Sequence, residues 1–255
     1  MSDRAPARFS LPALLTLGAL AGLLVAAWPA LVLLWQHHST IVAFPYPLDY
    51  GEGPLLDQVM RLARFETIYR VSLDAPPFTV ANYPPLFVLL QVPFAWLFGP
   101  AFWYGRALAA ISMLVAAVSC GLLVFELTGR RAAGVVSTVL LLVSPYILHW
   151  SALNRVDSLA LGLSCAGLAV LAHAHPSRRG RLVAATLLLA AVFTRQSYGL
   201  AAPLAAFVFV WREQGYAVAL RFAGLIAVSG ALLAGLLTLV TGGGFFFNIV
   251  TANVN

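Results

Sequence analysis

Apolar residues in this chain of 255 residues gather into long runs that short polar segments separate. A membrane hydrocarbon core about 30 Å thick requires roughly 20 consecutive apolar residues in a helix. The mean hydropathy of +0.90 and the charged fraction of only 9% agree with this pattern. The sequence therefore predicts an all-α polytopic membrane protein. The apolar runs are residues 11–35, 83–98, 103–127, 132–149, 157–174, 181–198, 199–211 and 217–241.

The arginines indicate which runs cross the membrane, because cytoplasmic segments are enriched in basic residues. If the run 83–98 crosses, the arginine clusters fall on both sides and the bias contradicts itself. If it does not cross, the clusters share one side and the acids share the other. This second partition predicts a multi-pass protein of the cell membrane with seven spans and a cytoplasmic amino terminus. The cytoplasmic arginines are then Arg4, Arg8, Arg130, Arg131, Arg178, Arg179, Arg181, Arg212 and Arg221, and the outer acids are Asp49, Glu52, Asp57, Glu66, Asp74 and Asp157.

The run 83–98 also has a composition that suits the membrane surface. Pro84, Pro85 and Pro93 interrupt it, and each removes a backbone hydrogen-bond donor. We expect an interfacial helix there and a second, amphipathic one over residues 54–70, both inside one large outer loop, 37–102. Residues 1–255 then form a single transmembrane domain. Because the chain ends on a polar, loop-like stretch, we expect it to be the amino-terminal portion of a longer protein.

Charge and cysteine content exclude two other classes of function. The net charge of +6 is distributed in short clusters between apolar runs, as in topogenic signals, so no nucleic-acid partner is expected. Cys120 and Cys165 both lie within apolar runs, without the spacing of a disulfide framework or a metal site. We interpret them as small core residues.

Three polar groups are predicted to meet at the outer face. Asp49 and Glu52 lie in PLDYGEGP (47–54), Asp157 closes NRVD (154–157), and Arg195 lies in TRQSY (194–198). Each also has a purely structural interpretation. The two acids could form a solvated turn, Asp157 could cap a helix, and Arg195 could extend to lipid headgroups. An arginine within a span is costly without a partner, and three such groups at one face favour a functional site.

The order of several short motifs resembles the GT-C class of membrane glycosyltransferases, within it the family of the protein mannosyltransferases and the lipid A aminoarabinose transferase. The resemblance covers about residues 10–200. It comprises LDYGEGP, YPPLF before a juxtamembrane helix, G-R-x-L-A (105–109), GRRAA (129–133), SPYI (144–147), R-x-D (155–157) and a polar pair late in the fifth predicted span. It implies a GT-C-like transmembrane helix bundle whose large first outer loop carries juxtamembrane helices.

The resemblance also implies an activity and its residues. A polyprenyl-phosphate-linked sugar would be the donor, and a lipid, glycan or protein on the outer face would be the acceptor. The general base falls on Asp49 or Glu52, with Glu52 preferred because the next helix begins directly after it. A divalent metal ion would be held by Asp157, together with Asp49. The donor phosphate would be bound by Arg155, Arg195, Gln196 and Tyr83. The chain departs from the family in one respect, since Tyr50 and Gly51 separate two acids that are commonly adjacent.

Two other functions remain open from the sequence. A transporter or lipid flippase could use an intramembrane Arg195 as a substrate or coupling site, although no inverted repeat is visible. A non-catalytic membrane scaffold, or an inactive fragment of an enzyme, is the other alternative.

Overall fold

The computed structural model describes residues 10–76, 78–173 and 177–253, and these residues form helices joined by turns and loops, without a strand. The α-helices are α1 Leu11–Ala43, α2 Glu52–Ala63, α3 Leu86–Leu89, α4 Val92–Phe98, α5 Trp103–Thr128, α6 Arg131–Leu142, α7 Pro145–Trp150, α8 Val156–His173, α9 Arg178–Val192, α10 Ala201–Gln214, α11 Tyr216–Val240 and α12 Gly244–Ile249. Two 3-10 turns are η1 Gln196–Gly199 and η2 Thr251–Asn253.

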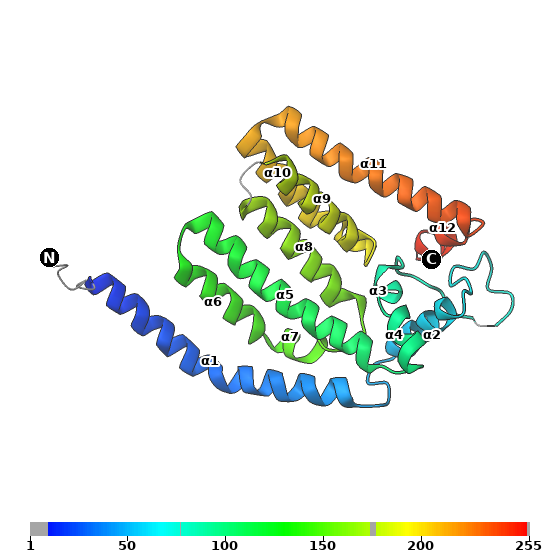
Figure 1. Cartoon of the computed structure of the whole chain (residues 1–255), viewed down its shortest axis with the longest axis horizontal. Helices are drawn as coiled ribbons and strands as arrows, with labels where there is room; N and C mark the ends of the chain where they lie inside the picture. Colours follow the sequence, from blue (N-terminus) through cyan, green and yellow to red (C-terminus); the bar gives the residue numbers. More distant parts are fainter. Residues whose placement is uncertain (1–9, 77, 174–176, 254–255) are drawn as a thin grey trace.

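Helices α5 and α8 lie side by side at the centre of a bundle (Figure 1). Small residues bring their backbones together, because a Cβ atom on Gly162 of α8 would stand 2.6 Å from the carbonyl oxygen of Ser112 on α5. Gly121 of α5 and Gly134 of α6 approach each other in the same way, with 2.7 Å between each virtual Cβ and the other's carbonyl oxygen. Close backbone contact through small residues is the usual packing of membrane helices.

Four helices are long and apolar enough to cross a bilayer: Leu14–Ala43, Trp103–Thr128, Val156–His173 and Tyr216–Val240. Most residues in the most apolar stretches of α1, α5 and α11 are not buried, and in α11 none is buried, whereas the central helix α8 is more than half buried. Exposed apolar surface of this extent is unfavourable in water, so these helices belong in a lipid bilayer. The prediction of a helical membrane protein is confirmed. The larger number of seven spans stays a prediction, because α6, α9 and α10 are shorter helices of 12, 15 and 14 residues.

Several helix bounds differ from the predicted ones for physical reasons. The first run continues past Trp35 to Ala43, and His38 within these added turns hydrogen-bonds the hydroxyl of Ser151. The run 132–149 divides into α6 and α7, since Pro145 begins a new helix after extended Ser144. The helix expected over 54–70 is α2, which ends at Ala63, and Phe65 then turns the chain with a left-handed φ of 61°.

The outer-loop segment folds into a small cap at one end of the bundle, where α2, α3 and α4 lie close to α12 (Figure 1). The run 83–98 forms the two short helices α3 and α4 within this cap. Asn248 of α12 fastens the cap, since its buried amide accepts from the N–H of Ala81 at 3.0 Å and donates to the carbonyl of Arg70 at 2.7 Å. Arg70 and Ala81 of the outer-loop segment are therefore held by a helix far along the chain.

Candidate functional site

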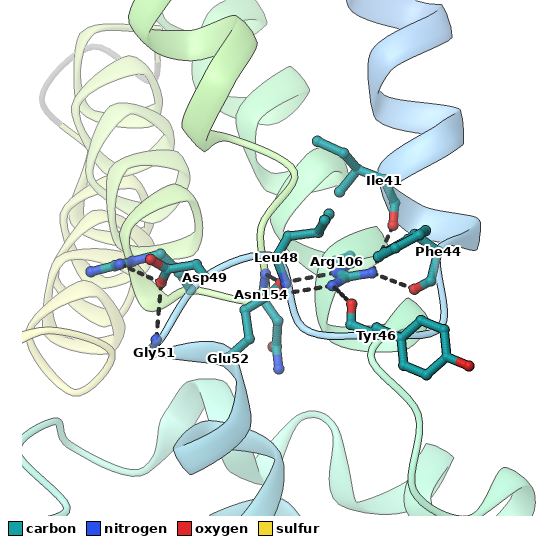
Figure 2. A network of polar contacts seen from close by, with 10 residues as sticks. Ile41, Phe44, Tyr46, Leu48, Asp49, Gly51, Glu52, Arg106 and Asn154 are labelled. Atoms are coloured by element: carbon teal, nitrogen blue, oxygen red, sulfur yellow. Dashed lines mark hydrogen bonds and ion pairs between the residues drawn. The ribbon is translucent and has the colours of Figure 1, made fainter.

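The polar residues singled out by sequence meet where the cap joins the bundle. Three segments meet at this junction: the loop after α1, the loop before α8 and the turn after α9. Figure 2 shows two separate ion pairs at the junction. One pair joins Glu52 to Arg106 and is completely buried. The other joins Asp49 to Arg155 and is partly accessible. Two acids separated by only two residues therefore have different surroundings.

Arg106 uses every N–H of its guanidinium inside the protein (Figure 2). Its Nε and Nη2 donate to the two carboxylate oxygens of Glu52 at 2.8 and 2.7 Å. The remaining donors reach backbone carbonyls at the end of α1 and in the loop after it, namely those of Ile41, Phe44 and Tyr46. Such a bidentate pair has the strongest geometry available to an arginine and a carboxylate. It ties together α1, α2 and α5.

Glu52 has no acceptor position left for chemistry. Besides the two bonds from Arg106, its oxygens accept from the backbone N–H of Leu48 at 2.7 Å and of Asn154 at 2.8 Å. Burial by itself would raise the pKa of Glu52, but the hydrogen bonds from Arg106, Leu48 and Asn154 outweigh it and hold the pKa below its usual value. Because a general base needs a free, accessible lone pair, the preference for Glu52 as the base does not fit this environment.

The carboxylate of Asp49 accepts fewer hydrogen bonds than that of Glu52. Its Oδ2 accepts from the Nη1 of Arg155 at 2.7 Å and from the N–H of Gly51 at 3.1 Å. Its Oδ1 receives no hydrogen bond from the described part of the chain. The side chain is 8% exposed and that of Arg155 is 21% exposed. Desolvation lowers the pKa of Arg155, but the nearby Asp49 carboxylate raises it more, so the guanidinium stays charged.

The ion pair continues into an alternating row of acids and arginines. The Nε of Arg155 lies 3.6 Å from a carboxylate oxygen of Asp157, and the other oxygen of Asp157 pairs with Arg195. Asp157 is in the first turn of α8, where the helix dipole favours an anion. Arg155 and Arg195 are both partly exposed, and their guanidinium groups remain accessible to an anionic ligand.

Aromatic rings flank both arginines. The guanidinium of Arg155 lies over the rings of Tyr50 and Trp150, with 5.7 and 5.6 Å to their centroids. The guanidinium of Arg195 lies 5.8 Å from the ring of Tyr83. Stacking against aromatic faces holds an arginine without consuming its N–H donors, which stay available for a phosphate.

Three adjoining cavities surround the row. The largest, of about 350 Å³, is lined by Arg155, Asp157 and Arg195 together with Trp150 and the ring of Tyr198. A second, of about 240 Å³, lies on the other side of Tyr50 and Arg155, between α2 and the segment 79–83. A third, of about 340 Å³, is shared by Tyr83, Arg195 and Gln196 with their neighbours Asn82 and Ser197. Arg155 therefore borders two cavities and Arg195 borders two.

Gln196 and Tyr83 lie beside Arg195, as the sequence predicts for phosphate-binding residues, although their role stays a prediction. The amide nitrogen of Gln196 donates to the carbonyl of Asn82 at 2.9 Å. Its Oε1 is buried and has no hydrogen-bond partner within the part of the chain that the structure describes. The hydroxyl of Tyr69, whose pKa is raised by burial, donates to the carbonyl of Tyr83 at 2.8 Å.

The donor set does not suit the divalent metal ion that the resemblance implies. Asp49 and Asp157 are each engaged by an arginine, and a cation placed between them would be repelled by two guanidinium groups. Within residues 10–76, 78–173 and 177–253, histidine, cysteine and carboxylate side chains form no group of three or more that could hold a metal ion. The residues present are suited to an anion.

Arg106 and Asn154, which lie at the centre of the network, entered the sequence analysis only as members of the motifs G-R-x-L-A and NRVD, without an assigned role. A signal for Arg106 was present, because an arginine inside an apolar run needs a partner. Asn154 is fully buried and its backbone N–H donates to Glu52, while its side-chain amide has no hydrogen-bond partner among the described residues. Nothing in its local sequence indicates this position.

Comparison with known proteins adds no relative: no protein-family model, curated protein or solved structure matches this chain.

Proposed function

We propose that this protein is a membrane glycosyltransferase that moves a sugar from a polyprenyl-phosphate-linked donor to an acceptor hydroxyl on the outer face of the membrane. The observation that carries the proposal is the row of alternating acids and arginines at the end of the bundle, in which the carboxylate of Asp49 pairs with Arg155, and Arg155 and Arg195 border the cavities. This transfer has three requirements: a general base, positive charge that binds the phosphate, and a cavity that holds the sugar.

The reaction assigns a separate task to each group. The acceptor oxygen attacks the anomeric carbon of the sugar and loses its proton to Oδ1 of Asp49. The bond from that carbon to the phosphate oxygen breaks, and the polyprenyl phosphate leaves with the electron pair. Arg155 and Arg195 stabilise the negative charge that grows on the departing phosphate. The mechanism requires no metal ion. Glu52 acts only by positioning Arg106 and the loops that contain Leu48 and Asn154.

The aromatic lining suits a sugar. Tyr50, Tyr146, Trp150 and Tyr198 surround the cavity of about 350 Å³ that Arg155 and Arg195 border, so C–H faces of a sugar ring could pack on apolar rings while its hydroxyls reach the polar row. The location suits a lipid-linked donor as well. Since Tyr146 is 68% exposed on the short helix α7, the lining extends from the cavity to the surface of the bundle, where a polyprenyl chain lies in the bilayer.

Two measurements on the purified full chain in nanodiscs test the proposal. Binding of polyprenyl phosphate is followed by tryptophan fluorescence, and transfer is followed with radiolabelled polyprenyl-phosphate mannose and glucose against a membrane extract. Asp49→Asn should lower transfer by about 10²–10⁴-fold and retain binding of polyprenyl phosphate, since it removes a positioned base. Arg195→Ala should weaken that binding. Asp57→Asn and Arg64→Ala are matched controls on the cap.

Three results would overturn the proposal. The first is wild-type protein that does not bind polyprenyl phosphate. The second is transfer by Asp49→Asn at the wild-type rate. The third is movement of the lipid-linked sugar across a vesicle membrane without any transfer, which would assign the site to a flippase.

A further inference from the structure

A groove at the end of the bundle opposite the polar site has the features of a lipid-binding site. It has a volume of about 640 Å³ and is lined by Thr16, Ala19, Leu20 and Leu23 of α1 and by Ala132, Ala133 and Val136 of α6, with Arg130 and Arg131 at its mouth. Helix α5 runs from the polar site to this end, about 39 Å for its 26 residues. The groove is therefore a separate feature of the molecule.

The groove exists because α1 separates from its neighbours toward its amino end (Figure 1). Gly18 and Gly22 face open space, with nothing within 4 Å of a virtual Cβ atom. Leu14, Leu15 and Leu17 are at least half exposed. A long apolar helix that leaves a bundle in this way must be solvated by acyl chains.

The mouth of the groove adds charge to this apolar surface. Arg130 and Arg131 are both exposed, and among the described residues neither guanidinium makes an ion pair or hydrogen bond. They stand at the amino end of α6, whose first N–H groups lack a side-chain cap and carry a partial positive charge. An apolar slot with two free arginines and a helix amino end at its mouth complements one acyl chain and one anionic headgroup.

We propose that this groove binds one anionic phospholipid of the adjacent leaflet, with its phosphate on Arg130 and Arg131 and an acyl chain between α1 and α6. Each arginine near the surface adds attraction to an anionic headgroup, so phosphatidylglycerol binds at least tenfold more tightly than phosphatidylcholine. The lipid fills the space that α1 leaves open and thereby holds α1 against α6.

Native mass spectrometry of the delipidated full chain, titrated with phosphatidylglycerol or phosphatidylcholine, tests this site. We expect one tightly retained phosphatidylglycerol. The double variant Arg130→Ala/Arg131→Ala should lose the preference and keep the weaker binding of phosphatidylcholine. Arg178→Ala/Arg179→Ala is the matched control, because these arginines are exposed at the start of α9 and do not line the groove.

A second pair of variants tests the acyl-chain slot. Ala19→Trp fills the groove and should abolish the tight binding, whereas Val25→Trp on an exposed face of α1 outside the groove should leave it unchanged. Equal retention of the two lipids by the wild-type chain would overturn the proposal. So would a preference lost equally in both double-arginine variants, or a second protein copy seated on the groove in place of lipid.

Discussion

Removing the charge of Glu52 should damage the fold rather than the chemistry. Glu52 and Arg106 are fully buried and joined by two short hydrogen bonds, and Arg106 also donates to three backbone carbonyls. Glu52→Gln would leave a buried guanidinium without a counter-charge and would turn an amide N–H toward the N–H of Leu48 or Asn154. Breaking a buried pair from one side costs about 3–5 kcal/mol.

Unfolding of the purified chain in mixed micelles with increasing SDS, followed by circular dichroism, measures this cost. We expect Glu52→Gln to lower the free energy of unfolding by about 3–5 kcal/mol, with Asp57→Asn, an exposed acid of the same helix, within about 0.5 kcal/mol of wild type. The double variant Glu52→Gln/Arg106→Met should lose less than the sum of its two single variants, because the two groups interact directly.

The same pair predicts a dependence of stability on pH. Since the folded-state pKa of Glu52 lies below its unfolded value of about 4.3, the folded state binds this proton more weakly than the unfolded state. The stabilisation is complete above that value and is lost as the pH falls through the lower, folded-state pKa. In the Glu52→Gln variant, this part of the loss of unfolding free energy at acid pH should be missing. A Glu52→Gln protein as stable as wild type, with full loss of sugar transfer, would refute the structural role and restore Glu52 as the base.

Four further outcomes are expected. Arg195→Lys should retain part of the polyprenyl phosphate binding that Arg195→Ala loses, because lysine keeps the charge but not the fork, and fluorescence titration measures both. Gly162→Ala should destabilise the chain by about 1–3 kcal/mol, since its methyl group would meet a backbone carbonyl of α5, whereas Gly224→Ala, which faces open space, should not; SDS unfolding distinguishes them. Asn248→Leu should lower both transfer and the melting temperature measured by circular dichroism, because it leaves the buried N–H of Ala81 without its acceptor and releases the loop at Arg70 and Ala81. A cysteine at Arg179 should be protected from an impermeant outer reagent, and its labelling would contradict the predicted topology.

The sequence predicted the all-helical class well, because apolar runs of this length can form few structures other than membrane-spanning helices. It predicted helix ends poorly wherever a polar residue has a distant partner. His38 looks like the end of a span, yet it lies within α1, and its ring hydrogen-bonds Ser151, 113 residues later. The break in the run 132–149 was readable, since Ser144-Pro145 is a sequence signal for a new helix.

The sequence predicted which charged residues belong to the candidate site. It did not predict which acid forms an ion pair with which arginine. Charged residues close to apolar runs point to a shared polar environment, and the structure brings Asp49, Arg155, Asp157 and Arg195 into one row. Their pairing depends on how α1, α5 and α8 pack, which no local pattern encodes. For this reason the sequence could not assign Arg106 to Glu52, its partner 54 residues earlier.

The spacing of the two acids in PLDYGEGP has a structural explanation in the loop that they face. Glu52 accepts the backbone N–H of Asn154, and Asp49 pairs with the side chain of the next residue, Arg155. One acid therefore fixes the backbone of this loop, and the other engages the guanidinium that the backbone carries. Because both contacts are to consecutive residues, a shift of the buried pair would move Arg155 relative to Asp49. The two acids must be separate in sequence so that Glu52 can be enclosed in the protein while Asp49 pairs with Arg155, which borders the cavities.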